Sequence, residues 1–297
     1  MLSDFSPAVL FVTPLLDGIS WGIILILVSV GLTLIFGFLE VINFAHGAFY
    51  MLGGYVAFAV VGATGSFWLA ILAAPVIIGI LALIMELSLL RPFYDMDPLT
   101  QVIITLGAAL VIEGAVVIIW GPRSKGIPIP DLFKESVSIL GTTYPLYRLV
   151  LAIVGGLTIA AIWAVFRYSR IGLVIQASLS DKTMVRALGY DIPRIYTIVF
   201  VAGVALAGLT GALMVPLRSV GPGTANTVLL DIFIVVVVGG LGSFRGTIVA
   251  GLLIGMTDIL VARYVSFRLS GITIFLILLV VLILRPYGLF GEKGFFE

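Results

Sequence analysis

The chain has 297 residues, of which 61% are hydrophobic and only 10% are charged. Soluble domains carry roughly 25% charged residues, so this composition excludes a soluble globular fold. The net charge of +1 offers no broad basic surface for nucleic acid, and the lack of cysteine beside a single histidine, His46, leads us to expect no metal ion and no cofactor.

Nine apolar segments predict helices that enter a lipid bilayer. A transmembrane helix needs about 20 apolar residues to cross about 30 Å of hydrocarbon, and it satisfies its own backbone hydrogen bonds. We therefore expect one all-α domain over residues 1–297, a polytopic membrane helix bundle with about eight to ten crossings. In chain order the segments cover residues 18–37, 43–62, 67–90, 100–120, 149–166, 195–217, 229–241, 247–262 and 271–284.

Glycines mark two features of these segments. Segments 229–241 and 247–262 are short and are separated by a glycine-rich stretch, so we expect them to form a broken or re-entrant pair and not two full crossings. G-x-x-x-G pairs occur at Gly18 and Gly22 and at Gly251 and Gly255. Lipid gives no hydrophobic drive that brings helices together, so helices pack where small residues let their backbones approach closely. These glycines therefore predict tight helix packing. The alternative is a glycine-lined helix face that slides during function.

The loops give the orientation. Residues 167–194 hold the densest run of Lys and Arg, which places them in the cytoplasm by the positive-inside rule. Counting back through five crossings places the N-terminus outside and residues 121–148 in a periplasmic loop, whereas an extra half-crossing near Glu40 would place the N-terminus inside. That loop holds Arg123, Lys125 and Lys134, which fit the rule poorly.

Polar groups inside apolar segments suggest a pathway, because they are costly in lipid unless paired or hydrated. Glu86 can approach Arg91, which favours a structural role. Glu113 has no basic neighbour on its own helix, so it meets another helix, stays protonated or faces water. Asn43 can cap a helix start and His46 follows closely, for packing or for substrate contact. The candidate pathway residues are Asn43, His46 and Glu113.

Residues 167–194 predict two short helices exposed to water. Ser180 can cap a second helix that begins near Asp181, and Gly189 followed by Pro193 ends it. Met184, Val185 and Leu188 would share one apolar face, which calls for a protein partner. The alternative is a helix that lies on lipid headgroups. No Gly-Lys dipeptide occurs, so any ATP must be hydrolysed elsewhere than in a P-loop of this chain.

Several motifs in order resemble the LivH-type permeases of branched-chain amino acid ABC importers. They are NFAHG at 43–47 with LGGYVAF at 52–58, RPF at 91–93, ITLG at 104–107, the R-x-G-x-x-x-x-A pattern at 170–177, ALGYDIPR at 187–194 and VVVVGGLGSFRGTIVAGLLIG at 235–255. The chain departs from that family at Gln176, where Arg is usual, and at Gly54, where Ala is usual. These departures leave the class intact and put the substrate in doubt.

The resemblance implies a partnership of subunits. It implies a second homologous permease subunit, two cytoplasmic ATP-binding subunits and a periplasmic substrate-binding protein, all at the bacterial inner membrane. It also implies that residues 167–194 couple the permease to the ATPases. The coupling candidates are Arg170, Gln176, Asp181, Met184, Val185, Arg186 and Leu188.

The sequence therefore favours a non-enzymatic permease that carries branched-chain or other apolar amino acids by alternating access. A stand-alone secondary transporter or channel for a small polar solute is the first alternative, with Glu113, Asp231 and His46 carrying protons or ions. A related ABC permease for urea or short amides is a second alternative. An intramembrane enzyme is the third.

Overall fold

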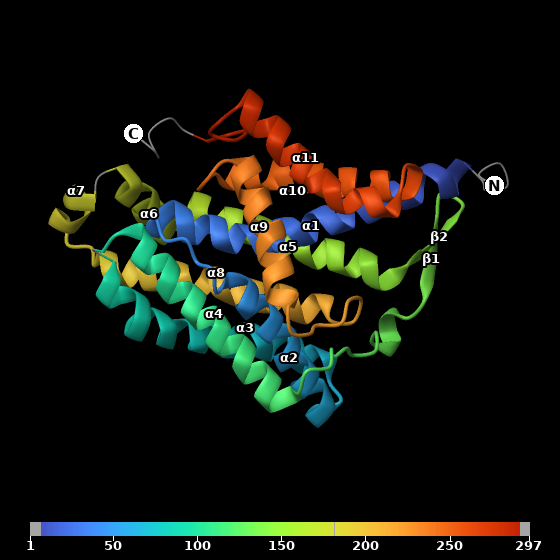
Figure 1. The fold of residues 1–297 in the computed structure, drawn as a ribbon, viewed down its shortest axis with the longest axis horizontal. Coiled ribbons are helices and arrows are strands. Elements are labelled where there is room, and N and C mark those ends of the chain that lie inside the picture. Colours follow the sequence, from blue (N-terminus) through green and yellow to red (C-terminus); the bar gives the residue numbers. More distant parts are fainter. Residues whose placement is uncertain (1–6, 95, 181, 292–297) are drawn as a thin grey trace. The chain divides into compact units, whose positions relative to one another are not determined.

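The computed structural model describes residues 7–94, 96–180 and 182–291, and most of them are helical (Figure 1). All nine predicted segments form helices. Two further short helices, α6 and α7, follow α5. The bounds are α1 Pro7–Leu39, α2 His46–Thr64, α3 Phe67–Met85, α4 Pro98–Trp120, α5 Leu146–Tyr168, α6 Arg170–Ser180, α7 Lys182–Ala187, α8 Ile192–Met214, α9 Thr224–Gly239, α10 Phe244–Tyr264 and α11 Phe267–Leu284.

Eight of the described helices are long and apolar enough to cross a membrane, which confirms the predicted polytopic helix bundle. Of the two segments predicted to be short, only the first forms a short helix. α9 has only 16 residues, but α10 has 21 and is one of the eight. Ser243 caps α10 by accepting a hydrogen bond from the N–H of Gly246, so this helix begins earlier than the apolar run predicted.

Side-chain caps fix where most of the long helices begin, because the first turn of a helix leaves backbone N–H groups unsatisfied. Asp97 precedes α4 and accepts hydrogen bonds from both the hydroxyl and the N–H of Thr100, and these bonds lower the pKa of Asp97. Pro98 occupies the first position of that helix, where no N–H is needed. The same kind of cap stands at Ser66, Asp191, Ser243 and Ser266.

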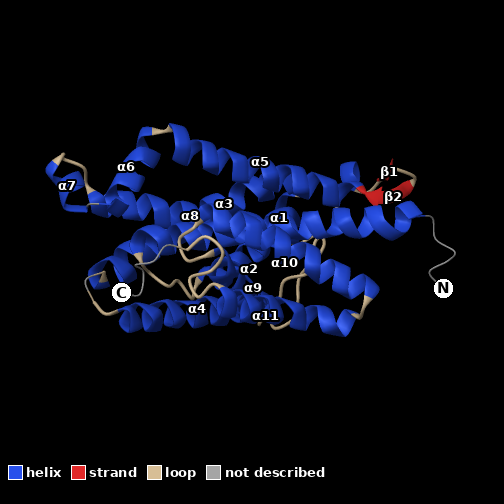
Figure 2. Ribbon diagram, turned by 90° about the horizontal axis from the view of Figure 1, so that it is seen from above, coloured by secondary structure: helices blue, strands red, loops and turns tan. Residues whose placement is uncertain are grey.

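The stretch predicted as a loop, residues 121–148, contains a pair of strands that the apolar pattern did not predict. Strands β1 (Ser136–Ile139) and β2 (Thr142–Pro145) form an antiparallel hairpin (Figure 2). Its two-residue turn, Leu140 and Gly141, has φ angles of 48° and 81°, as a type I′ turn requires. Leu-Gly is a weak signal for such a turn, so the sequence did not predict the hairpin.

The hairpin is tied to α1. The hydroxyl of Tyr144 donates to Asp17 at 2.9 Å and lies 3.3 Å from the hydroxyl of Ser20, and burial raises the pKa of Tyr144 to about 12. Arg148 forms an ion pair with the same carboxylate. Thr13 and Thr142 are joined by a hydrogen bond of 3.0 Å. Polar contacts therefore hold the hairpin against the first helix.

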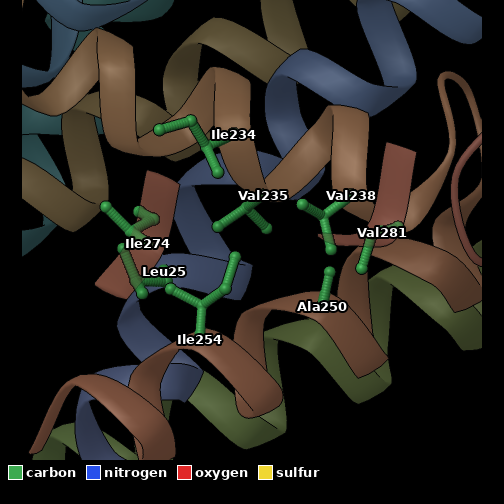
Figure 3. Close-up of a cluster of buried hydrophobic side chains, with 8 residues drawn as sticks. All are labelled: Leu25, Ile234, Val235, Val238, Ala250, Ile254, Ile274 and Val281. Carbon is green, nitrogen blue, oxygen red and sulfur yellow. The ribbon is translucent and has the colours of Figure 1, made fainter. Parts of the chain in front are cut away.

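The chain divides into two compact units, each with its own core. One unit contains the chain up to Ser29, Pro128–Leu157 and the chain from Asp231 onward. Its core is a cluster of aliphatic side chains from α1, α9, α10 and α11 (Figure 3). The cluster consists of Leu25, Ile234, Val235, Val238, Ala250, Ile254, Ile274 and Val281.

The two G-x-x-x-G motifs of this unit pack on each other. A Cβ atom at Gly255 would lie 2.4 Å from the backbone of Gly22, and a Cβ atom at Gly22 would lie 3.0 Å from the carbonyl oxygen of Gly251. At Gly18 the added atom would meet the backbone of Met256 at 2.9 Å. The prediction of tight glycine packing is confirmed, and it joins α1 to α10.

The C-terminal segment closes the short helix α9. The N–H groups of Leu289 and Phe290 donate to the carbonyls of Val238 and Gly239 at 2.9 and 3.0 Å. The side chain of Arg285 bonds the carbonyl of Leu289 at 2.9 Å. The last carbonyls of α9 thus have protein partners, which a helix too short to cross a bilayer needs.

The second unit contains Val30–Ile127 and Thr158–Leu230. Its helix α8 packs against α2 and α3, and α2 also contacts α4. A Cβ atom at Gly53 would lie 2.2 Å from the carbonyl oxygen of Gly208, and one at Gly211 would lie 2.0 Å from that of Tyr50. Close backbone contact therefore joins α2 to α8 as well.

We expect Gly255→Ala to lower the melting temperature of the detergent-solubilised protein by several degrees. The new methyl group would overlap the backbone of α1, and overpacking of this kind costs about 1–3 kcal/mol. Gly271→Ala on α11 is the matched control, because no atom lies within 4 Å of its added Cβ. Equal melting temperatures for the two variants, measured by thermal unfolding, would contradict the packing of α1 on α10.

Candidate functional site

The start of α2 is built around Asn43, which is completely buried. Its Oδ1 accepts the N–H of Ala45 at 3.1 Å, and its carbonyl accepts the N–H of His46 at 3.2 Å. Asn43 therefore shapes the turn before the helix, whereas the N-cap position itself is Ala45. Its Nδ2 has no hydrogen-bond partner among the described residues, so two amide donors stay available inside an apolar region.

Thr105 on α4 completes this turn. It is fully buried, its hydroxyl accepts the N–H of Phe44 at 3.2 Å, and it lies 3.1 Å from the carbonyl oxygen of Ile42. The ITLG and NFAHG motifs, some 60 residues apart, thus meet through hydrogen bonds between the Thr105 side chain and the backbone of the turn. Sequence reasoning missed Thr105; a lone threonine in an apolar helix was the only signal.

His46 is the first residue of α2 and is fully buried. Its Cε1 would lie 3.0 Å from a Cβ atom at Gly31 of α1. In the next position, a Cβ atom at Gly47 would lie 2.2 Å from the carbonyl oxygen of Ala225 in the first turn of α9. The start of α2 therefore lies in close contact with α1 and α9 within this unit.

Glu113 finds its partner on another segment, one of the three alternatives that the sequence left open. Its Oε1 accepts the N–H of Gly223 at 2.6 Å, directly before the first residue of α9. A carboxylate at a helix N-terminus satisfies a free N–H group and interacts favourably with the helix dipole. This contact explains how α4 can contain the carboxylate of Glu113 although no basic side chain lies near it on the same helix.

The polar stretch at 167–194 folds as two short helices, as predicted (Figure 1). Ser169 starts α6 by accepting the N–H of Gly172 at 3.0 Å, and Gln176 donates from Nε2 to the carbonyl of Phe166 at 2.9 Å. The amide that stands where the family usually has Arg thus holds α6 against the end of α5. A left-handed Gly189, with φ 87°, follows α7, as the predicted stop required.

The predicted apolar face of the second helix needs a correction. Met184 and Leu188 are 59% and 70% exposed, but Val185 is buried at 3%. Leu188 follows the last residue of α7, and its N–H donates to the carbonyl of Met184 at 3.0 Å, so Met184 and Leu188 share the exposed face without Val185. Asp181 lies outside the described residues. Exposed side chains of this stretch include Arg170, Gln176, Met184, Arg186, Leu188 and Tyr190.

Glu86 pairs with Arg91 as expected, with Oε1 of the carboxylate 3.3 Å from Nε. Arg91 also reaches the carbonyl of Pro193 at the start of α8. The beginning of α8 therefore lies beside the end of α3.

Lys125 and Val220 form a β-bridge through two backbone hydrogen bonds of 2.7 and 2.8 Å. The segments that follow α4 and α8 therefore meet each other.

Comparisons with known proteins show which family this chain is similar to. A family model described as branched-chain amino acid transport system / permease component matches residues 15–282. The chain is 30% identical to the high-affinity branched-chain amino acid transport system permease protein LivH of Escherichia coli (strain K12). It is 29% identical to LivH of Salmonella typhimurium (strain LT2) and 28% identical to BraD of Pseudomonas aeruginosa. Each alignment covers 95% of this chain and 96% of the relative. No solved structure matches the chain significantly.

We expect Glu113→Gln to keep most of the stability of the protein, because an amide oxygen can still accept the N–H of Gly223. Glu113→Leu leaves that N–H without its acceptor, which costs about 1–3 kcal/mol. The melting temperature in detergent should therefore order as wild type, then Gln, then Leu. A Leu variant as stable as wild type would show that the contact to α9 does not hold the helix.

Proposed function

Because the chain belongs to the family of branched-chain amino acid transport system permease components, we propose that it forms a path that opens to each side of the membrane in turn. The recognised family, the multi-pass arrangement in the bacterial inner membrane and the role as a permease component are confirmed. Permeases of this family are typically non-catalytic. A component of a transport system works with other subunits, which favours this proposal over a stand-alone channel.

The proposed partners are those of an ABC importer. A second related permease subunit would complete the path, a periplasmic binding protein would deliver the amino acid, and two cytoplasmic subunits would hydrolyse ATP. Closure of the ATPases would move residues 167–194, and this movement would shift the packed helices between two arrangements. The cargo would be a branched-chain or another apolar amino acid.

The observation that carries the docking proposal is the exposure of apolar side chains outside the candidate membrane spans. Met184, Leu188 and Tyr190 are 59%, 70% and 48% exposed, and they lie between the spans that end at Tyr168 and begin at Ile192. Exposed apolar side chains that gather on a charged polar stretch mark a protein interface. Arg170 and Arg186 would add contacts to acidic groups of the partner.

The path itself would pass the start of α2. Asn43 offers two buried amide donors, which can hydrogen-bond the carboxylate of a passing amino acid and so lower the cost of leaving water. His46 lies one helix position from the close contact with α9 and would shape the path. Glu113 would act on it indirectly, by holding the first turn of α9. A few weak contacts suit a permease, because a tight site would slow release.

Met184→Ser combined with Leu188→Ser should reduce the amount of ATPase that co-purifies with the tagged chain, because two exposed apolar contacts are lost. Leu140→Ser at the hairpin turn is the matched control, since Leu140 is 77% exposed in the other polar loop. Quantitative immunoblots of the purified complex measure the effect. Wild-type recovery of the ATPase with the double variant would overturn the docking proposal.

Asn43→Ser should lower leucine uptake severalfold while binding-protein-stimulated ATP hydrolysis stays near wild type. Serine keeps an oxygen that can accept the N–H of Ala45 in a turn, so the fold is preserved while the amide donors are removed. Asn226→Ser, at an exposed position of α9, is the control. Equal losses of uptake and hydrolysis, measured in proteoliposomes, would assign Asn43 to structure alone.

A further inference from the structure

A buried carboxylate follows directly after α3, inside the candidate membrane span Phe67–Phe93. Glu86 is fully buried and begins η1 (Glu86–Leu90), a π-helical turn that leads into the 3-10 helix η2 (Arg91–Phe93). π-Helical turns are rare, and they frequently occur at functional positions.

The carboxylate of Glu86 is satisfied by donors from two sides. Oε1 accepts from Nε of Arg91 at 3.3 Å and from the hydroxyl of Tyr94 at 3.0 Å. Oε2 accepts from the hydroxyl of Thr197 on α8 at 3.1 Å. Arg91 also donates to the oxygen of Thr197. A buried charge is tolerated only with such partners, so separation of α8 from the end of α3 would leave it unsatisfied.

The partners on α8 lie at the end of the polar stretch 167–194 and directly after it. The carbonyl of Pro193 lies 3.0 Å from the hydroxyl of Thr197 and also accepts from Arg91. The rings of Tyr94 and Tyr196 meet edge to face, with centroids 6.0 Å apart. The first two turns of α8 are therefore attached to η1 and η2 by polar and aromatic contacts together.

The attachment extends to α4 through Gln101, which is buried. Its Nε2 lies 3.4 Å from each of the carbonyl oxygens of Phe93, Tyr94 and Met96. The turn between α3 and α4 is thus held from both of its sides. Three helices share this end of the unit through hydrogen bonds of fixed direction.

We propose that Glu86, Arg91 and Thr197 are positioning residues that transmit the movement of residues 167–194 to α3. This inference rests on the proposed function, because it assumes that an ATPase moves the stretch. A purely apolar contact would let α8 slide along α3, since such contacts have no direction. The donor from α8 is Thr197, whereas Arg91 and Tyr94 follow α3, so a shift of α8 alone would break the hydrogen bond from Thr197 to the carboxylate, and α3 therefore follows α8.

Thr197→Val tests the link, because valine matches the shape of threonine and removes its hydroxyl. We expect the leucine transported per ATP hydrolysed to fall roughly tenfold, as the loss of one hydrogen bond to a charged group would produce. Thr197→Ser restores the hydroxyl and should restore the ratio. Thr210→Val is the control on the same helix, since Thr210 is buried and donates only to the carbonyl of Leu206.

The ratio is measured with the complex purified through a tag on this chain, reconstituted with its companion subunits in liposomes with radiolabelled leucine. A ratio unchanged in Thr197→Val overturns the inference, and so do parallel losses of uptake and hydrolysis, which indicate a structural role only. If Thr197→Val yields no complex, Arg91→Lys carries the test. Lysine keeps the charge but cannot bridge Glu86 and Thr197 with a planar fork, and the same loss is expected.

Measurements on the wild-type complex distinguish a failure of this inference from a failure of the proposed function on which it rests. Absence of ATP-driven leucine uptake by the wild type would remove the proposed function, and the inference with it. Normal uptake by the wild type, together with a normal ratio in Thr197→Val, would remove the inference alone.

Discussion

Lipid tails offer neither hydrogen-bond partners for the backbone nor a hydrophobic drive that brings helices together, and the structure follows from this constraint. Helices meet where glycine lets one backbone touch another. In one unit Gly22 and Gly255 join α1 to α10, and in the other Gly53 and Gly208 join α2 to α8. Each contact excludes even a methyl group, so these positions fix which helices are neighbours.

The same constraint explains the few polar side chains inside the helices. Thr105 binds the turn before α2, Glu113 binds the segment before α9 and Glu86 binds the start of α8. Each satisfies a group that lipid would leave without a partner, and each connects segments far apart in sequence. Asn43 differs, because its amide nitrogen has no partner in the part of the chain that the structure describes. That difference is why we assign Asn43 to the path and the others to the scaffold.

Much of the fold follows from local pattern, and the failures have specific physical causes. Apolar length predicts the long helices, but it underestimated α10, because Arg245 and Arg263 bound the apolar run while the helix extends from Phe244 to Tyr264. The hairpin around Leu140 carries no strong turn signal. The partner of Glu113 is a backbone N–H. The sequence analysis looked for a basic side chain near Glu113, so it could not find this partner. Val185 is buried although its neighbour Met184 is exposed, and the apolar pattern alone does not distinguish the two.

The central claim is that ATPase subunits outside this chain drive the movement of its helices through the polar stretch at 167–194. The most direct test compares leucine accumulation in liposomes that hold the chain alone, under a solute or ion gradient, with liposomes that hold the complete complex and ATP. The account predicts concentrative uptake only with the companion subunits and ATP. Robust accumulation by the chain alone would contradict it.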